Sequence, residues 1–320
     1  MLNFFYLLSG VALLTVGGEA LIRGSLAAAK RLGISPLLSG LVIVGFGTSA
    51  PEMVVSVDAA INHRPDIAIG NVVGSNIGNV LLILGLCALI TPLAVKPLVL
   101  RRDAVMVVVA TGLFLVLVGG SAVNAMDGAI FLIALTAYLV WAYRSEKNHT
   151  AEAAELYQAE ADELTALPKS VLWTGMAIIL GLMLLIAGSQ VLLLGAVGIA
   201  QHLGVSEAVI GLTLVAVGTS LPELSISVIA ALRRHADVAV GNVLGSNIFN
   251  VLGILGVSAL LQPLPVPVRV LQFDQWVMFA TAVLLLVFLY TGRRLSRLEG
   301  GIFLLGYGVY IVLSFTLFAR

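Results

Sequence analysis

The feature that most constrains the fold is an internal repeat. Residues 47–86 align with residues 218–257 without a gap, and 24 of the 40 positions are identical. The match continues outside this segment, and after one added residue it still pairs Tyr138 with Tyr310. A repeat that takes up half a chain indicates two copies of one structural unit. We therefore expect a first unit over residues 1–143 and a second unit over residues 170–320.

The composition places both units in a lipid bilayer. Of the 320 residues, 60% are hydrophobic and 11% are charged, and the mean hydropathy is +1.09. Ten stretches reach or approach the length of about 20 apolar residues that spans a membrane. They are residues 3–28, 36–61, 67–91, 103–120, 124–143, 170–200, 207–231, 238–261, 273–291 and 299–319. The sequence thus predicts an all-α polytopic membrane protein with ten transmembrane helices, five in each unit.

The number of helices per unit determines how the two units are related. Five is odd, so the second unit enters the membrane from the opposite side, and the units are expected to be inverted repeats. Lys and Arg collect in short cytoplasmic loops, which gives an independent test. With the N-terminus outside, thirteen basic residues lie on the inner side and three on the outer side. The inner set is Lys30, Arg31, Lys96, Arg101, Arg102, Arg144, Lys147, Lys169, Arg233, Arg234, Arg293, Arg294 and Arg297, and the outer set is Arg64, Arg269 and Arg320. Both termini are therefore predicted outside the cytoplasm of a cell (inner) membrane protein, with residues 144–169 as an acidic cytoplasmic linker.

The repeated segment begins with an acid inside an apolar stretch. Gly-Thr-Ser-Ala-Pro-Glu, ending at Glu52, carries a carboxylate that costs about 2.5–3.5 kcal/mol near a bilayer centre and so needs a polar partner. Pro51 has no N–H and breaks the helix there. The hydroxyls of Thr48 and Ser49 then gather beside Glu52, and this is a set of hard oxygen donors suited to Na⁺ or Ca²⁺. The copy Gly-Thr-Ser-Leu-Pro-Glu repeats the set with Thr219, Ser220 and Glu223.

A polar face follows on the next helix of each unit. At helical spacing Asn71, Ser75 and Asn79 share one face, and their copies are Asn242, Ser246 and Asn250. Polar side chains in membrane helices commonly hydrogen-bond to a neighbouring helix. Ser75, Asn79, Ser246 and Asn250 lie on a duplicated polar line beside a duplicated carboxylate, so for them ion ligation is favoured. For Asn76 and Asn247, off this face, the two roles remain equally open.

The donor set limits the choice of ion. Two bidentate glutamates and two threonine hydroxyls supply six oxygens, the lower end of the ~6–8 that Ca²⁺ accepts. No Cys or His accompanies the acids, which disfavours Zn²⁺ and copper, and Mg²⁺ fits a dry protein cage poorly. The four histidines are expected at helix ends or in loops, and no nucleophile and base pair is evident, so an enzyme is not expected. No basic run exceeds two residues, and nucleic acid is not an expected partner.

These motifs carry a family resemblance. The two Gly-Thr-Ser-x-Pro-Glu segments, each followed by Gly-Asn-Val-x-Gly-Ser-Asn-Ile, resemble the two alpha-repeats of the cation/Ca²⁺ antiporter superfamily in its Na⁺/Ca²⁺ exchanger branch. The resemblance implies ten ligand residues and backbone carbonyls near Gly45 and Ala216. The ligands are Thr48, Ser49, Glu52, Ser75, Asn79, Thr219, Ser220, Glu223, Ser246 and Asn250. Several relatives, K⁺-dependent ones among them, have Asp at the position of Asn250, which argues against K⁺ co-transport here.

The expected function is a secondary active antiporter that exchanges Na⁺ for Ca²⁺ by alternating access, with both ions as substrates and no cofactor. Buried carboxylates can take up protons, so exchange of Ca²⁺ for H⁺ through the same two glutamates is the alternative. A passive cation channel is disfavoured, because a channel needs no pair of Pro-broken helices in inverted halves. The lipid bilayer is the expected environment, and a monomer is the working expectation.

Overall fold

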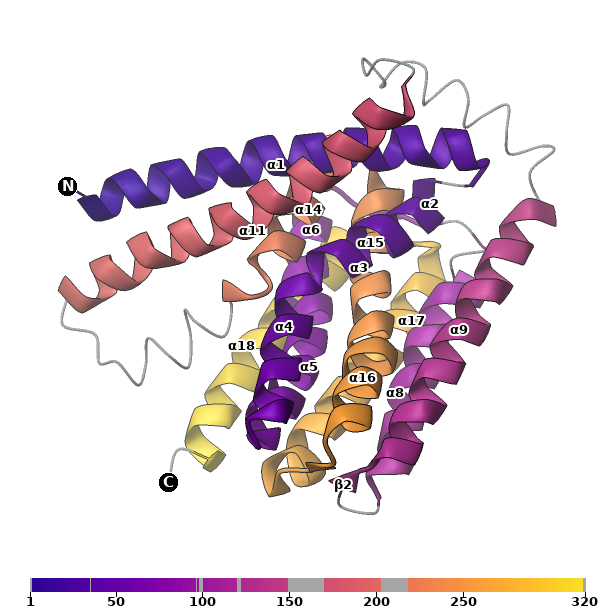
Figure 1. The fold of residues 1–320 in the computed structure, drawn as a ribbon, viewed down its shortest axis with the longest axis vertical. Helices are drawn as coiled ribbons and strands as arrows, with labels where there is room; N and C mark the ends of the chain where they lie inside the picture. The colour runs from indigo at the N-terminus through magenta and orange to yellow at the C-terminus, as the bar shows by residue number, and fades with distance from the viewer. Residues whose placement is uncertain are drawn as a thin grey trace.

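The computed structural model describes residues 2–34, 36–95, 97, 100–119, 122–148, 170–202 and 218–318. This part of the chain is nearly all helical (Figure 1). The first half contains α1 (Leu2–Leu32), α2 (Pro36–Ser39), η1 (Gly40–Gly45), α3 (Phe46–Thr48), α4 (Ala50–Ile61), α5 (Pro65–Gly78), η2 (Asn79–Leu84), α6 (Gly85–Ile90), β1 (Leu93–Ala94), η3 (Leu100–Ala104), α8 (Val105–Val118), β2 (Ala122–Val123) and α9 (Ala125–Asn148). The second half contains α11 (Val171–His202), α14 (Leu221–Leu232), α15 (Ala236–Phe249), η5 (Asn250–Ile254), α16 (Leu255–Leu261), β3 (Leu264–Pro265), η6 (Val270–Asp274), α17 (Gln275–Gly292), β4 (Arg294–Leu295) and α18 (Arg297–Phe318).

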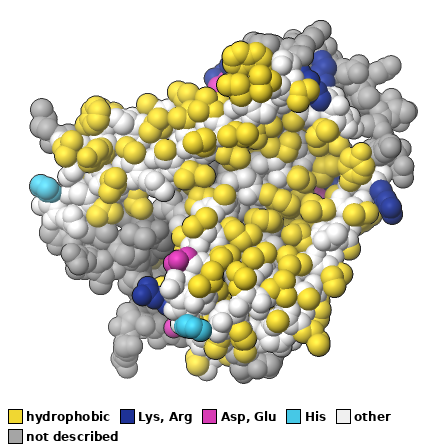
Figure 2. All heavy atoms as spheres, viewed as in Figure 1, with side chains coloured by type: hydrophobic (Ala, Val, Ile, Leu, Met, Phe, Trp, Pro, Cys, Tyr) yellow, Lys and Arg dark blue, Asp and Glu magenta, His cyan; other side chains and the backbone are white. Residues whose placement is uncertain are grey.

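The lengths of these helices are those of a multi-pass membrane protein. Seven helical spans in the described residues are long and apolar enough to cross a bilayer, or eight if the bent pair Gly40–Thr48 and Ala50–Ile61 is one span. Hydrophobic side chains cover much of the face in Figure 2, and the charged ones gather near its edges. The total of ten helices stays a prediction, because residues 203–217, which include part of a predicted helix, lie outside the described ranges. The same holds for most of the predicted linker, from residue 149 to residue 169.

The two halves make corresponding turns and breaks. A non-helical residue interrupts the helix before each glutamate, Ser49 with φ −79° and ψ 7° and Ser220 with φ −87° and ψ 9°. Twelve-residue helices follow both breaks, and each ends before a residue with positive φ, His63 at 56° or Arg234 at 61°. The break predicted at Pro51 is therefore confirmed, and the two segments of that span meet at 48°.

Two short antiparallel sheets join one half to the other. In the first sheet β1 pairs with β4, and in the second β2 pairs with β3. In the internal alignment β1 corresponds to β3 and β2 to β4. The first sheet, β1 with β4, is thus the counterpart of the second, β3 with β2. Contacts of this reciprocal kind are those that a two-fold relation produces.

The core lies around α5 and α15, whereas α1 and α11 form a separate pair. Of the hydrophobic window in the span Ala236–Leu261, 83% is buried, compared with 11% for Arg297–Ser314. The long helices α1 and α11 cross the others at a steep angle (Figure 1). They approach closely because glycines line their contact: a methyl group at Gly17 would lie 2.9 Å from the Gly181 carbonyl oxygen.

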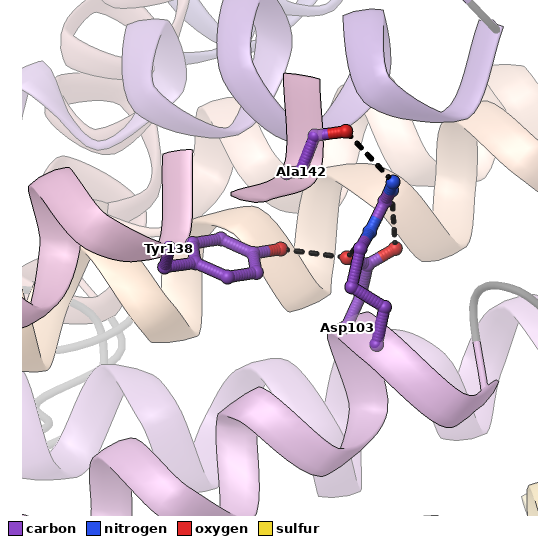
Figure 3. Close-up of polar contacts among 4 residues, drawn as sticks. Asp103, Tyr138 and Ala142 are labelled. Carbon is purple, nitrogen blue, oxygen red and sulfur yellow. Dashed lines mark hydrogen bonds and ion pairs between the residues drawn. The ribbon is translucent and has the colours of Figure 1, made fainter. Parts of the chain in front are cut away.

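A buried ionic cluster fastens η3 to α9. The guanidinium of Arg102 donates from Nε to Asp103 Oδ1 (2.6 Å) and from Nη1 to the carbonyl oxygen of Ala142 (3.2 Å), and the hydroxyl of Tyr138 donates to Asp103 Oδ1 (2.7 Å). Figure 3 shows how these groups converge on the Asp103 carboxylate. Arg102 is 1% exposed. Its placement on the inner side stays a prediction, and its charge is paired with Asp103 inside the fold.

The second half builds the same cluster with an arginine from another position. The hydroxyl of Tyr310 donates to Asp274 Oδ1 (3.0 Å), and Arg269 donates from Nε to Asp274 Oδ2 (2.8 Å). The aspartate and tyrosine match their counterparts in the repeat, but the arginine lies five residues before its aspartate here and one residue before it in the first half. The cluster is thus conserved in space between the halves and only partly in the internal alignment.

Candidate functional site

The two helix breaks bring the serine of each half to the glutamate of the other. Ser49 Oγ donates to Glu223 Oε1 at 3.0 Å, and Ser220 Oγ donates to Glu52 Oε1 at 3.1 Å. Both carboxylates are buried, with no more than 1% of either glutamate exposed. The structure thus brings together the two Gly-Thr-Ser-x-Pro-Glu segments, as the sequence predicts. An acid in this position is stabilised from across the interface between the halves, not only by its own helix.

A second pair of bonds fixes the helix that follows each glutamate. Asn71 donates from Nδ2 to the carbonyl oxygen of Glu52 at 3.2 Å and to Ser56 Oγ at 2.9 Å. In the other half Asn242 makes the matching bonds, to the Glu223 carbonyl at 3.2 Å and to Ser227 Oγ at 2.8 Å. These amides hold α5 against α4 and α15 against α14. Asn71 and Asn242 therefore support the site, although they share the polar face of the predicted ligands.

Four further asparagines meet where α5 and α15 end. Asn79 donates from Nδ2 to Asn247 Oδ1 at 2.9 Å, and Asn250 donates from Nδ2 to Asn76 Oδ1 at 3.0 Å. Asn79 begins the π-helix η2 and Asn250 begins the π-helix η5. Wider turns of this kind occur often at functional sites. The predicted ligands Asn79 and Asn250 are thus fixed by contacts with the opposite half.

Oxygen atoms without a hydrogen-bond partner gather on the predicted ligands. Seven buried side-chain oxygens in the described residues accept or donate no hydrogen bond. Five of them belong to the predicted set: Glu52 Oε2, Asn79 Oδ1, Thr219 Oγ1, Glu223 Oε2 and Asn250 Oδ1. Leaving a buried polar atom unsatisfied costs about 1–3 kcal/mol, so such a concentration needs an explanation. A bound cation supplies one, because it interacts with several oxygens at once.

The remaining predicted ligands have partners already. Thr48 Oγ1 donates to Asn242 Oδ1 at 3.1 Å, and Ser246 Oγ donates to the Gly45 carbonyl oxygen at 3.0 Å. Ser75 Oγ lies 3.3 Å from Ser220 Oγ, within hydrogen-bond distance. Each of these oxygens keeps a lone pair for a cation. Of the two expected backbone ligands, the Gly45 carbonyl accepts hydrogen bonds, and Ala216 lies outside the described residues.

The chemistry of this donor set is that of a hard cation site. The described residues contain no cluster of three or more His, Cys, Asp or Glu side chains. Two carboxylates and several neutral oxygens are a poor set for Zn²⁺ or copper and a good one for Ca²⁺ or Na⁺. Two negative charges balance one Ca²⁺. The donor set therefore fits a hard cation held by two acids and several neutral oxygens.

One acid outside the duplicated set, Glu19, links α1 to this core; the sequence left a structural hydrogen bond and a place on the access path equally open for it. Glu19 accepts from Arg23 Nη2 at 2.7 Å on its own helix, and its other oxygen lies 3.3 Å from Arg233 Nη2 at the end of α14. Its counterpart in the repeat is Gln190, so duplication gave no signal. The signal that remained was the presence of Glu19 and Arg23 one helical turn apart in an apolar stretch, which is a favourable ion-pair spacing.

Comparisons with known proteins agree with this geometry. The chain is 40% identical to CaxA from Alkalimonas amylolytica, a candidate antiporter. The match covers 97% of this chain and 98% of CaxA. It is 32% identical to the sodium/calcium exchanger MaX1 from Methanosarcina acetivorans, with 98% of each chain covered. Among solved structures, the sodium-calcium exchanger NCX_Mj soaked with Na⁺ and Ca²⁺ superposes with a TM-score of 0.82 at 33% identity, with 98% of each chain covered. A sequence model of the family described as "Sodium/calcium exchanger protein" matches residues 2–144 and 173–316. The chain therefore belongs to the sodium/calcium exchanger protein family.

Proposed function

We propose that this protein is a secondary active antiporter that exchanges Na⁺ for Ca²⁺ at the site between the two Gly-Thr-Ser-x-Pro-Glu segments. The observation that carries the proposal is that most of the described buried oxygens without a hydrogen-bond partner belong to predicted ligands, among them Glu52, Asn79, Glu223 and Asn250. Membership of the exchanger family supports the same conclusion. Ca²⁺ and Na⁺ are the substrates, and no resident cofactor is required. The ten predicted ligands are Thr48, Ser49, Glu52, Ser75, Asn79, Thr219, Ser220, Glu223, Ser246 and Asn250.

Competition for the two carboxylates couples the ions. One Ca²⁺ neutralises Glu52 and Glu223, and in a low-dielectric site an uncompensated charge is strongly disfavoured. Na⁺ ions that occupy the same oxygens therefore displace Ca²⁺ rather than bind beside it. The flanking helices then expose the site to one side of the membrane or to the other. Transport in one direction of one ion thus requires transport of the other ion in return.

The architecture proposed for this cycle is two inverted units of five helices, residues 1–143 and 170–320, joined by the linker 144–169. The reciprocal bonds of Ser49 with Glu223 and of Ser220 with Glu52 support it, because a two-fold relation pairs equivalent groups crosswise. In such transporters the site lies at the interface between the repeats near the bilayer midplane. We place the protein in the cell (inner) membrane, as a monomer, with both termini outside the cytoplasm.

Exchange of Ca²⁺ for H⁺ is the second candidate. The observation that favours it is the burial of both glutamates, since a desolvated carboxylate binds a proton more readily than one in water. A passive channel is disfavoured by the cross-bonded halves, which give alternating access a structural basis. An enzyme is disfavoured as well, because the relatives named above are transporters.

Flux measurements on reconstituted protein separate these functions. We expect uptake of radioactive Ca²⁺ into proteoliposomes when an outward Na⁺ gradient is imposed, and little uptake when Na⁺ is equal on both sides. A pH gradient imposed without Na⁺ provides the comparison. Uptake driven by the pH gradient alone would establish proton exchange. Uptake that needs neither gradient and does not saturate would establish a channel and refute exchange.

A further inference from the structure

Asn76 and Asn247, whose role the sequence left open, form a reciprocal hydrogen-bonded pair. Asn76 donates from Nδ2 to the backbone carbonyl of Asn247 at 3.0 Å, and Asn247 donates from Nδ2 to the backbone carbonyl of Asn76 at 3.3 Å. Both side chains are 3% exposed. The pair joins α5 to α15 directly. This much is an ordinary contact between two membrane helices.

The other end of each amide is used differently. Asn76 Oδ1 accepts from Asn250 Nδ2 at 3.0 Å, and Asn247 Oδ1 accepts from Asn79 Nδ2 at 2.9 Å. Neither side-chain oxygen of the pair is left unpartnered, whereas Asn79 Oδ1 and Asn250 Oδ1 both are. Asn76 and Asn247 thus accept hydrogen bonds from the NH₂ groups of Asn250 and Asn79, and the side-chain oxygens of Asn250 and Asn79 make no hydrogen bond with the described residues.

This arrangement matters because an asparagine amide has two ends of nearly equal shape and opposite polarity. Its oxygen is an acceptor, and its NH₂ group is a donor. A cation is attracted by the oxygen and repelled by the NH₂ group. If the amide of Asn250 turned over, its oxygen would face Asn76 Oδ1, another acceptor, and its NH₂ group would replace the free oxygen. The contact with Asn76 therefore permits one orientation.

We propose that Asn76 and Asn247 are positioning residues that hold the amides of Asn250 and Asn79 with their oxygens directed to the transported cation. Each acts across the interface: Asn76 of the first half orients a ligand of the second, and Asn247 orients a ligand of the first. The proposal rests on the proposed function, in which Asn79 and Asn250 bind the ion. Ion affinity then depends on correct contact between the halves, not only on the residues that touch the ion.

A crosswise rescue experiment tests this role. Asn76→Ala is expected to weaken Ca²⁺ binding by about tenfold, since it frees the Asn250 amide to turn and removes one buried hydrogen bond. In an Asn250→Asp background the same change is expected to have less than about a twofold effect, because a carboxylate presents an oxygen in either orientation. In an Asn79→Asp background the tenfold loss should persist. The mirror set, Asn247→Ala in the same two backgrounds, should show the opposite pattern and carries the test if Asn76→Ala does not fold.

The measurement is isothermal titration of the purified full-length protein in detergent with CaCl₂, with thermal unfolding recorded without Ca²⁺. Equal losses in both aspartate backgrounds would overturn the proposal and leave only a helix-packing role for the pair. Asn79→Ala and Asn250→Ala separate the two levels of the argument. If both bind Ca²⁺ as the parent does, the ligand assignment of the proposed function fails. If both lose binding while the crosswise pattern is absent, the positioning role alone fails.

Discussion

The helices α5 and α15 carry the same motif, and the described residues pack on them differently. On α15, Gly245 lies directly against the backbone of Leu41 in η1, and a methyl group added to Gly45 would be 2.9 Å from the Asn242 carbonyl oxygen. On α5, nothing in the described residues lies within 4 Å of a methyl group placed at Gly74, the counterpart of Gly245. Helix α15 therefore has a close neighbour along its glycine face, and the same face of α5 has none among the residues described.

The described hydrogen bonds beside α15 and beside α5 differ as well. Thr48 and Ser246, at the closely packed side, bond to Asn242 and to Gly45. On the other side Thr219 Oγ1 has no hydrogen-bond partner among the described residues. The two halves thus share the motif residues, while the contacts made by the described residues differ between them.

The largest expected effect comes from the two glutamates, and it tests whether the chemistry of the halves is equal. Glu52→Gln and Glu223→Gln each remove one of the two charges that balance Ca²⁺, so we expect Na⁺-driven Ca²⁺ uptake to fall by at least about 100-fold in both. The exposed Asp58, whose counterpart is Ile229, provides the matched control, and Asp58→Asn should stay within about twofold of the parent. Near-normal exchange by either well-folded glutamine variant would refute the symmetric site.

The glycines test whether the packing of the halves differs. A methyl group in the contact between Gly245 and Leu41 costs about 1–3 kcal/mol, so Gly245→Ala should lower the melting temperature by several degrees. Gly74→Ala should leave it within about 2 °C of the parent, since no described atom opposes the added methyl group. Thermal unfolding in detergent measures both. Equal losses in the two variants would mean that the faces are equally packed.

Ser49 and Ser220, which hydrogen-bond across the interface between the halves, allow the two environments to be compared at the site itself. Ser49 is fully buried, while Ser220 is partly exposed. The hydrogen bond of Ser49 to Glu223 is therefore less screened. Hydrogen bonds to charged groups contribute about 1.5–3 kcal/mol, so Ser49→Ala should weaken Ca²⁺ binding by about tenfold, and Ser220→Ala by about threefold. Titration with CaCl₂ decides the order. A larger loss in Ser220→Ala would contradict the difference in environment that the structure shows.

The smallest expected effect concerns the ion pair between α1 and α14, which has no counterpart in α11. Arg233 is 60% exposed and Glu19 26% exposed, and solvent screens a pair of this kind. Glu19→Gln should therefore change the Ca²⁺ uptake rate by no more than about twofold, and Gln190→Ala serves as the control in the other half. A loss as large as that of Glu52→Gln would mean that Glu19 belongs to the ion path.

Much of this molecule was readable from the sequence because duplication repeats each signal. The offset between the halves singled out Glu52 and Glu223 and predicted both helix breaks, since a proline within a long apolar helix removes the N–H that would bond four residues back. Strong apolar runs gave the membrane class for a similar reason, as the bilayer leaves few alternatives to helices. Local residue patterns, present in both halves, were sufficient to predict these features.

The tertiary structure decided which side chains meet. The internal alignment pairs Ser49 with Ser220. In space, however, Ser49 bonds to Glu223, because the two halves face each other and equivalent groups meet crosswise. Only the packed helices bring Arg102 and Asp103 against Tyr138, a contact that the charges alone did not predict. The same holds for Asn76 and Asn247, whose role depends on the direction of one amide against another across 171 residues. Sequence specifies which donors and acceptors exist, but the direction of each hydrogen bond depends on neighbours that folding brings together.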